Sequence, residues 1–263
     1  MQSAIDSLAT FAAEKGVILL PSAEEEHTNI GIDAWTLALQ KKYNNVPEKP
    51  RVYTTYQTYL KSTPAKLAAH LEEARKHGYT AGVKLVRGAY LHSEPRERIW
   101  ETIEKTHECY DGLAEACLKK EWNSVLKPVN GDTNTPFPDI GVVIATHNAV
   151  SVQRAMRIRD AQAAAHQPRP QLAYAQLLGM ADEVSTKIIL DRKQKEMEGA
   201  KGLLNVDAPR AFKCVCWGTT GQCLNYLLRR ASENRDAVQR TGETRKAMGE
   251  EVVRRVKGFI GLA

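Results

Sequence analysis

The chain has 263 residues, of which 43% are hydrophobic and 26% are charged. This length suffices to bury a substantial core, and we take a single globular domain as the default. The net charge is +6, but 37 basic residues are spread beside 31 acidic ones without a long basic run, which argues against nucleic acid as a partner.

Five cysteines lie at positions 109, 117, 214, 216 and 223. Their number is odd and no CxxC spacing recurs, which argues against a disulfide framework or a structural zinc site and favours a reducing compartment. No apolar run approaches the roughly 20 residues that a membrane-spanning helix needs. Residues 1–16 have a helical pattern with mixed charges instead of the pattern of a signal or transit peptide, and we expect the chain to begin inside a fold.

Helical and strand patterns alternate through the first 90 residues. Apolar residues at helical spacing, a Ser-Thr-Pro start at residues 62–64 and a stop at Gly78 mark the helices, whereas short apolar, β-branched or aromatic runs mark the strands. The expected helices are 2–15, 29–43 and 62–78, and the expected strands are 17–20, 51–57 and 82–88.

The same alternation continues to the end of the chain. We expect a helix between about 97 and 120, a polar, Pro-rich loop at 127–138, strands at 141–148, 171–180 and 211–218, a helix through about 165 and two closing helices over most of 220–257. About six strand-helix units in succession favour a parallel α/β fold, because each parallel crossover needs a helix of this length.

The pattern fits both an open doubly wound sheet and a barrel. The chain has no GxGxxG motif after its first strand and no GxxxxGK[ST] motif, so nucleotide binding by those loops is unsupported. A closed parallel barrel takes eight strands, which leaves this chain about two short.

Polar side chains at the carboxyl ends of parallel strands face the ligand site in α/β folds, so these positions are the first candidates for function. Lys84 in the strand 82–88 is either an outward charge on a poorly buried strand or a group that faces a ligand. Gly88 and Ala89, at the end of this strand, would let a planar ligand approach the backbone. His147 lies at the carboxyl end of the strand 141–148 and, taken alone, is more typical of a hydrogen-bonded histidine in a strand-end turn than of a ligand-binding group.

Two further features have competing interpretations. Cys214 and Cys216 alternate on one face of a strand and are better explained as small core side chains than as metal ligands, because further ligands at suitable spacing are missing. In the helix "LNYLLRRASEN" the leucines form an apolar stripe, which would send Arg229 and Arg230 to solvent. Alternatively, the polar face covers a cavity where the two guanidinium groups bind a carboxylate.

Four colinear segments resemble the proline dehydrogenases, particularly the fungal mitochondrial ones: "GVKLVRGAYL", "ATHN", "QLLGM" and "WGTTGQCLNYLLRRASENRDAV". The resemblance extends from about residue 2 to 257. It implies a distorted (βα)8 barrel with non-covalent FAD that oxidises L-proline to pyrroline-5-carboxylate by hydride transfer to the flavin, the first step of proline catabolism. It also implies a mitochondrial location, a quinone acceptor and peripheral association with the inner membrane.

The resemblance further assigns roles to individual residues. Lys84 matches the basic residue that hydrogen-bonds the reactive nitrogen of the flavin, and Lys84 and Tyr90 are the catalytic candidates. The other cofactor-binding candidates are Val86, Gly88, Ala89, His147 and Asn148. The substrate-binding candidates are Tyr90, Leu177, Tyr226, Arg229, Arg230 and Glu233, of which the arginine pair would hold the proline carboxylate.

The sequence also departs from the family pattern. Ser22 stands where the family has an aspartate, Cys214 where it has an active-site tyrosine, Gln222 where it has a glutamate, and Thr54 where relatives often have Gln or Asn. By the same resemblance, the family's first two barrel strands have no counterpart in this sequence, and we expect a single barrel domain over residues 1–263 that is truncated at its N-terminus relative to the family. These departures leave two hypotheses open: an enzyme for L-proline or a related cyclic imino acid, and a catalytically degenerate homologue that binds a ligand or a partner.

Overall fold

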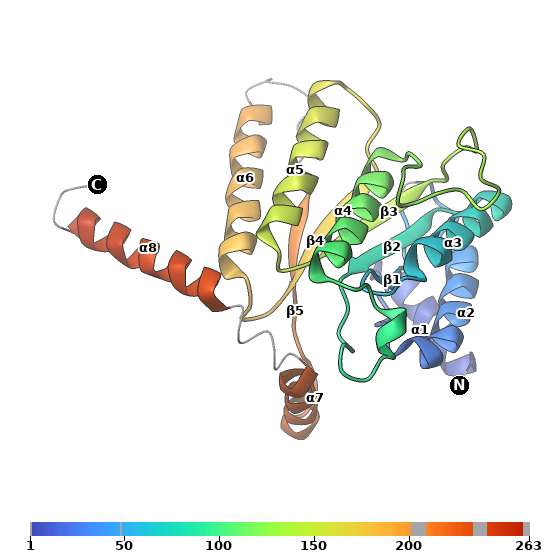
Figure 1. Ribbon diagram of the computed structural model, residues 1–263, viewed down its shortest axis with the longest axis horizontal. Helices are drawn as coiled ribbons and strands as arrows, with labels where there is room; N and C mark the ends of the chain where they lie inside the picture. The colour runs from blue at the N-terminus through green and yellow to red at the C-terminus, as the bar shows by residue number, and fades with distance from the viewer. Residues whose placement is uncertain (1, 48, 201–208, 234–240, 260–263) are drawn as a thin grey trace.

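A parallel sheet of five strands forms the centre of the structure, a computed structural model that describes residues 2–47, 49–200, 209–233 and 241–259 (Figure 1). The strands are β1 (Thr54–Gln57), β2 (Ala81–Val86), β3 (Ile140–Ala145), β4 (Gln171–Leu177) and β5 (Arg210–Cys214). They lie in the sheet in the order in which they occur in the chain, and every neighbouring pair is parallel. The predicted parallel α/β fold is therefore confirmed.

Helices connect the strands and flank the sheet. They are α1 (Gln2–Glu14), α2 (Glu26–Tyr43), α3 (Thr63–His77), α4 (Ile103–Lys119), α5 (Ala149–Ala164), α6 (Asp182–Ala200), α7 (Thr220–Glu233) and α8 (Thr241–Phe259), with a 3₁₀ helix at Arg96–Arg98. Figure 1 shows α7 and α8 standing away from the layer formed by α4, α5 and α6. None of the helices in the described ranges combines the length and the apolar character that a membrane crossing requires.

The expected strand at residues 17–20 is reduced to a single parallel bridge between Leu19 and Val52. The N–H of Leu19 donates to the carbonyl of Arg51 at 2.8 Å, and the N–H of Tyr53 donates to the carbonyl of Leu19 at 2.9 Å. Pro21 follows at once, and its ring removes the N–H that a longer ladder would need. The six expected strand-helix units are thus five strands and one bridge.

Helix ends follow the local signals in the sequence. The helix α3 ends at Gly78, whose φ of 68° is the left-handed conformation that glycine adopts without a steric penalty. The helix α5 begins after Asn148, whose side chain accepts a hydrogen bond from the N–H of Ser151 at 3.0 Å. This cap places Asn148 directly at the carboxyl end of β3.

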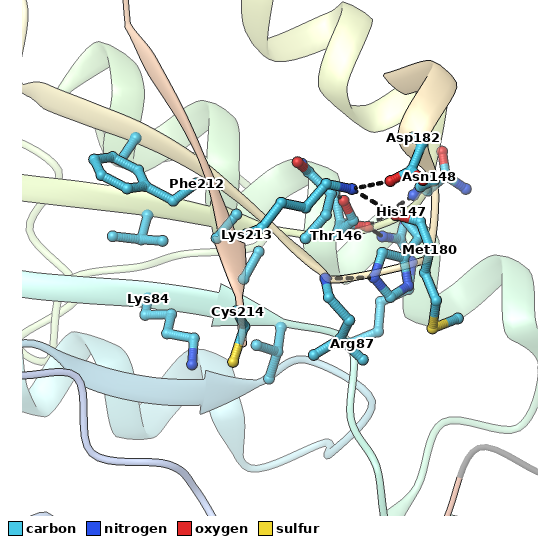
Figure 2. A pocket seen from close by; sticks show the side chains of 18 of the residues that line it. Lys84, Arg87, Thr146, His147, Asn148, Met180, Asp182, Phe212, Lys213 and Cys214 are labelled. Carbon is cyan, nitrogen blue, oxygen red and sulfur yellow. Dashed lines mark hydrogen bonds and ion pairs between the residues drawn. The ribbon is translucent and has the colours of Figure 1, made fainter. Parts of the chain in front are cut away.

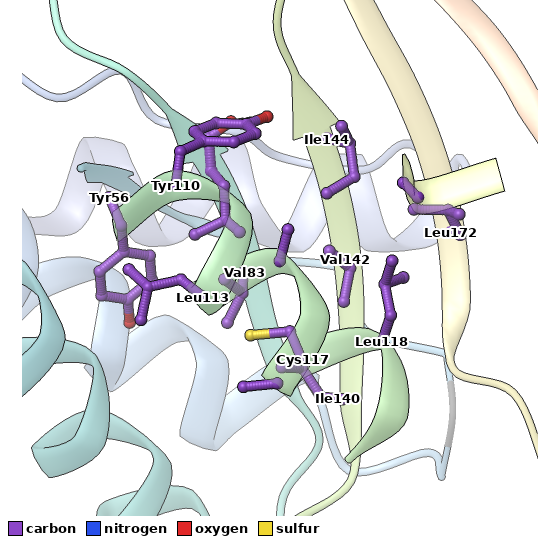
Figure 3. Close-up of a cluster of buried hydrophobic side chains, with 14 of the residues drawn as sticks. Tyr56, Val83, Tyr110, Leu113, Cys117, Leu118, Ile140, Val142, Ile144 and Leu172 are labelled. Carbon is purple, nitrogen blue, oxygen red and sulfur yellow. The ribbon is translucent and has the colours of Figure 1, made fainter. Parts of the chain in front are cut away.

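The main hydrophobic core lies between the outer face of the sheet and the helices α3, α4 and α5 (Figure 3). Val83 and Leu85 of β2 and Val142 and Ile144 of β3 alternate on this face and are fully buried. Because side chains of a strand point alternately to its two faces, the residues between them, beginning with Lys84, point to the opposite, inner face.

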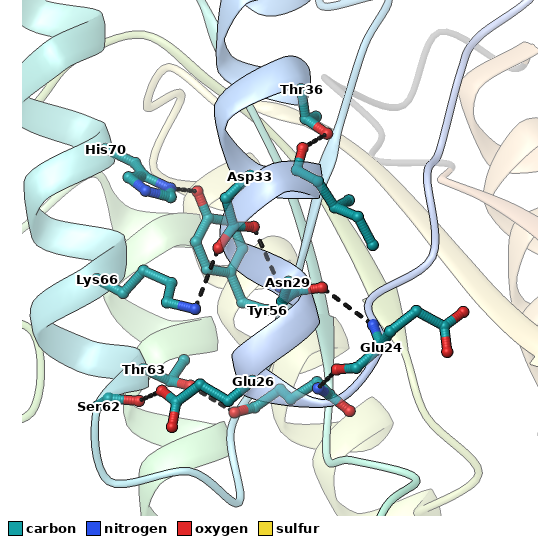
Figure 4. Close-up of polar contacts among 12 residues, drawn as sticks. Glu24, Glu26, Asn29, Asp33, Thr36, Tyr56, Ser62, Thr63, Lys66 and His70 are labelled. Carbon is teal, nitrogen blue, oxygen red and sulfur yellow. Dashed lines mark hydrogen bonds and ion pairs between the residues drawn. The ribbon is translucent and has the colours of Figure 1, made fainter. Parts of the chain in front are cut away.

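A network of polar side chains joins α2 to α3, and a hydrogen bond of 2.8 Å between Tyr56 and His70 joins β1 to α3 (Figure 4). Lys66 forms an ion pair of 3.1 Å with Asp33, whose other carboxylate oxygen accepts a hydrogen bond from Asn29 at 3.2 Å. The side-chain oxygen of Asn29 in turn accepts the backbone N–H of Glu24 at 3.0 Å. This network positions the segment 21–24, which borders the inner face of the sheet.

Candidate functional site

A cleft of about 2600 Å³, which we call the inner cleft, lies against the inner face of the sheet. Its floor is made of every second residue of the strands, as the pleat requires. One row of neighbours across five strands is Thr55, Lys84, Val143, Ala173 and Arg210. The cleft exceeds the volume of about 300–1,000 Å³ that is usual for a small-molecule site, so it has room for a large cofactor together with a substrate.

Small side chains leave the middle of this floor flat. Ala145, Ala173 and Ala175 lie on neighbouring strands β3 and β4 and all line the inner cleft. Gly88 and Ala89 border the same space at the end of β2. A planar ring can therefore approach the sheet closely here, because no long side chain stands between it and the backbone.

Lys84 and Arg210 are the charged groups of this row, and Figure 2 shows the Lys84 ammonium beside the thiol of Cys214. Burial lowers the pKa of Lys84; the neighbouring Cys214 opposes this shift, and the positive charge of Arg230 adds to it. Within the part of the chain that the structure describes, the half-buried ammonium donates to no acceptor. Lys84 thus presents unused hydrogen-bond donors to the cleft.

His147 and Asn148 form the turn between β3 and α5 and line the inner cleft. The backbone N–H of Leu177 donates to Nε2 of His147 at 3.1 Å, so this nitrogen carries no proton and the ring is held against β4. Asn148 uses its side-chain oxygen to cap α5. Both predicted cofactor residues therefore border the cleft, and both are tied to the fold by side-chain hydrogen bonds.

Tyr90 lies beside the cleft instead of on its floor. Its hydroxyl donates to the carboxylate of Glu24, and the residue is absent from the cleft lining. Gly88, two residues earlier, has a φ of 145°, and a Cβ atom there would meet the ring of Tyr59 at 2.1 Å. The chain can make this turn because residue 88 is glycine.

The helix α7 contributes two of the predicted substrate residues to the inner cleft, Tyr226 and Arg230. Nε of Arg230 donates to the Tyr226 hydroxyl at 3.3 Å, and its guanidinium carbon lies 5.4 Å from the Tyr226 ring centre. Arg229 stacks on the same ring at 5.8 Å but is exposed and does not line the cleft. The side chain of Glu233 lies outside the described residues.

The apolar stripe of α7 differs from the expectation of a buried face. Leu224, Leu227 and Leu228 are 54%, 49% and 68% exposed, because α7 packs on few neighbours.

The prediction that Cys214 and Cys216 are core side chains is wrong: Cys214 is exposed and Cys216 is only half-buried. Cys214 ends β5, which has a single strand neighbour among the described residues, and Cys216 follows outside the strand.

The four departures from the family pattern occupy different places. Ser22 and Cys214 both line the inner cleft. Gln222 instead accepts the N–H of Thr219 at 2.9 Å near the start of α7, and Thr54 faces away from the cleft, where its hydroxyl accepts from Gln40 at 2.8 Å. Only the first two substitutions therefore change the chemistry of the cleft itself.

Sequence reasoning missed several cleft residues. Lys213 donates to the Met180 carbonyl at 2.8 Å and to Asp182 at 2.7 Å, which ties β5 to the start of α6 (Figure 2). Gln57 lines the cleft and donates to the Glu24 carbonyl at 2.8 Å. A lysine or glutamine inside a strand pattern was the available signal, since such side chains need a polar partner or a ligand. Among the described residues, no three His, Cys, Asp or Glu side chains lie close enough together to hold a metal ion.

These features define a parallel α/β protein with a ligand cleft bounded by the carboxyl ends of its strands, a flat floor, a lysine directed into the cleft and an arginine above it. A sequence profile described as Proline dehydrogenase matches residues 2–243. The chain belongs to the proline dehydrogenase family.

Individual relatives agree with this assignment. The "Probable proline dehydrogenase, mitochondrial" of Schizosaccharomyces pombe is 30% identical over 258 residues, covering 95% of this chain and 49% of the relative. The human "Proline dehydrogenase 1, mitochondrial" is 32% identical over 262 residues, covering 98% and 39%. The chain thus spans at most about half the length of these two relatives. The crystal structure of proline utilization A from Bdellovibrio bacteriovorus has the same fold, with a TM-score of 0.64, 19% identity, and coverage of 89% of this chain and 21% of that one.

Proposed function

We propose that this chain forms the flavin site of a dehydrogenase that oxidises L-proline, or a related cyclic imino acid, to pyrroline-5-carboxylate. The observation that carries the proposal is the placement of Lys84: a half-buried ammonium without an acceptor among the described residues, on a floor of small residues, with Arg230 lining the same cleft. This combination suits a flat, electron-accepting ring together with an anionic substrate.

The residues of the inner cleft fit FAD. Lys84, Val86, Gly88 and Ala89 would hold the ring system, since one supplies donors and the others leave the backbone accessible. Bound FAD supplies the chemistry of accepting a hydride, that is, two electrons and one proton, from the substrate carbon. The turn at residues 146–148 closes the same side of the cleft. FAD is therefore the proposed cofactor, and no metal ion is invoked.

The substrate half of the cleft lies beneath α7. Arg230 would bind the carboxylate, with Tyr226 fixing its guanidinium, and Leu177 provides an apolar contact for the substrate ring. Arg229, Tyr90 and Glu233 keep their proposed roles in substrate binding, although Arg229 and Tyr90 do not line the cleft in this arrangement. The chain's own residues thus orient an amino-acid anion against the floor.

The names of two relatives place those proteins in mitochondria, which supports our proposal of the same location for this chain. We further propose a quinone at the inner membrane as the electron acceptor. We also propose that residues 1–263 form a single domain.

A second candidate is a catalytically degenerate homologue that binds an amino acid or a partner. Ser22 and Cys214 favour it, because both line the inner cleft at positions where the family pattern has an aspartate and a tyrosine. The two candidates differ in whether bound flavin is reduced by proline.

The absorption spectrum of the purified chain, reconstituted with FAD and then given L-proline without oxygen, tests both. Bleaching of the flavin bands supports the dehydrogenase. Bound flavin that stays oxidised with L-proline and with other cyclic imino acids supports the degenerate homologue. Lys84→Met is the matched variant, because it removes the cleft ammonium, and Lys213→Met controls for loss of a lysine that already has protein partners. A chain that does not bind FAD contradicts the proposed cofactor.

A further inference from the structure

Arg87, at the carboxyl end of β2, is one member of a closed ring of hydrogen bonds with Thr146, Asn148 and Ser151. Its Nη1 donates to Oγ1 of Thr146 at 2.6 Å, and its Nη2 donates to Oγ of Ser151 at 2.8 Å. The backbone N–H of Asn148 donates to the same Thr146 hydroxyl at 3.1 Å, and the N–H of Ser151 donates to Oδ1 of Asn148 at 3.0 Å. One guanidinium therefore braces both sides of the turn that joins β3 to α5.

Two contacts from α4 fix the plane of this guanidinium. Nε of Arg87 donates to Nδ1 of His107 at 3.0 Å, and the guanidinium carbon lies 4.3 Å from the centre of the Tyr110 ring. Arginine stays protonated in proteins, so Nδ1 of His107 must be the acceptor. A lysine at this position could not replace the arginine, because a single ammonium cannot reach three acceptors in a planar fork and stack on a ring.

The braced turn carries His147, whose Nε2 accepts the N–H of Leu177 and so links β3 to β4. Arg87, Thr146, His147 and Asn148 all line the inner cleft, and Figure 2 shows them grouped on one side of it. The ring of hydrogen bonds thus sets the shape of one wall of the cleft from four different elements: β2, β3, α4 and α5.

We propose that Arg87 is a positioning residue for the inner cleft: it holds residues 146–148 in the one conformation that seats His147 against β4 and shapes the wall on the cofactor side. The claim that Arg87 supports cofactor binding rests on the proposed function. The claim that Arg87 holds the turn at residues 146–148 concerns the protein alone and can be measured without a ligand.

Arg154 provides a matched control. It also joins α4 to α5, through a hydrogen bond of 2.7 Å to Glu115 and an ion pair of 3.9 Å with Asp111. Its side chain is 49% exposed, however, and it does not line the cleft. Asp111 also accepts from Oγ of Ser151 at 2.6 Å, so Arg154 reaches the ring of hydrogen bonds only through Asp111. Arg87, in contrast, holds both Thr146 and Ser151 directly. Loss of Arg154 therefore tests the helix contact, and loss of Arg87 tests the turn.

Hydrogen exchange of the ligand-free chain is the first measurement. In Arg87→Lys, the amide of Leu177 should exchange at least about tenfold faster, because the turn no longer holds His147, the acceptor of this amide, in a fixed position. Arg154→Met should leave that amide unchanged. Thr146→Val, which removes the shared hydroxyl and keeps the arginine, should reproduce the effect and serves in place of Arg87→Lys if that variant does not fold.

Cofactor titration is the second measurement, followed by flavin fluorescence. The dissociation constant for FAD should rise at least about tenfold in Arg87→Lys, whereas the KM for L-proline, set beneath α7, should stay unchanged. If Arg87→Lys and Arg154→Met change the exchange of the Leu177 amide and the dissociation constant for FAD equally, Arg87 only connects helices as Arg154 does, and the proposal is overturned.

The two proposals can fail separately. If the Leu177 amide is unchanged in both Arg87→Lys and Thr146→Val, the positioning role is wrong, whether or not the chain binds FAD. If the amide exchanges faster but the unaltered chain binds no FAD, the positioning role stands and the proposed cofactor is wrong.

Discussion

Leu177 donates its backbone N–H to Nε2 of His147 at 3.1 Å, which joins the ends of β3 and β4 at the rim of the inner cleft. The contact uses a side-chain acceptor where the sheet's own ladder ends. It makes the imidazole part of the scaffold, with its Nε2 lone pair already engaged before any ligand arrives.

His147→Ala should lower the free energy of unfolding by about 1–2 kcal/mol, because the N–H of Leu177 loses its acceptor in a half-buried place. Urea denaturation measures the change. His27→Ala is the control, since that ring is 66% exposed and should alter stability by less than about 0.5 kcal/mol. Equal stability of both variants would show that the contact contributes nothing.

Gly88→Ala should destabilise the protein by at least about 3 kcal/mol. The φ of 145° disfavours any Cβ atom, and that atom would also meet the ring of Tyr59 at 2.1 Å. Gly131→Ala separates the two causes, because Gly131 has a φ of 72° but no neighbour within 4 Å, and we expect a cost of only about 1 kcal/mol there. Similar losses in both variants would mean that the tyrosine ring moves aside at little cost.

Lys84→Met should raise the free energy of unfolding at neutral pH and remove a pH dependence. Burial lowers the pKa of Lys84 in the folded chain below its ordinary value of 10.5. Between the lowered pKa and 10.5 the unfolded chain holds a proton that the folded chain has lost, so stability rises with pH through this window. The advantage of the methionine variant should therefore shrink as the pH rises toward 10.5. Denaturation curves at several pH values would contradict this if the difference stayed constant.

Arg230→Met should raise the KM for L-proline at least about tenfold, as expected for one lost charge-assisted hydrogen bond. Arg229→Met should change it by less than about threefold, because Arg229 is exposed and lies outside the cleft lining. Steady-state kinetics of the two variants measure the difference. An equal rise in both would mean that α7 turns when substrate binds and brings both guanidinium groups to the carboxylate.

Alkylation should distinguish the exposed thiol of Cys214 from the buried thiols of Cys109 and Cys117. Burial raises the pKa of Cys109 to about 11 and that of Cys117 to about 12, so at pH 8 both stay protonated and covered. The exposed Cys214 should react with iodoacetamide in the native chain, whereas Cys109 and Cys117 should react only after unfolding. Mass spectrometry of the labelled peptides gives the order, and early labelling of Cys117 would show that α4 opens readily.

Most of the fold could be predicted because its signals are local. Runs such as 82–88 and 141–148 are apolar over the length of a strand, and Gly78 marks the end of its helix. The expected strand at 17–20 was longer than the single bridge found, because hydrophobicity alone does not account for the lost N–H of Pro21.

The candidate site could be predicted only in part. The rule that strand ends face the ligand, together with the family resemblance, picked out Lys84, His147 and Leu177, which all line the cleft. The partners of Arg87 lie 20, 59 and 64 residues away in the chain, and no local pattern reports contacts at such separations. The exposure of Cys214 depends on how few neighbours β5 has, which is a property of the whole sheet.

The order of the strands has a consequence for synthesis. Because β1 to β5 lie side by side in the order in which a ribosome makes them, each new strand meets the edge formed just before it and waits for no later segment. The sheet can therefore grow in one direction while the chain is still being made, and β5 joins it after the other four strands, with α7 following β5. The arginine that covers the cleft is thus added only after the floor beneath it is complete.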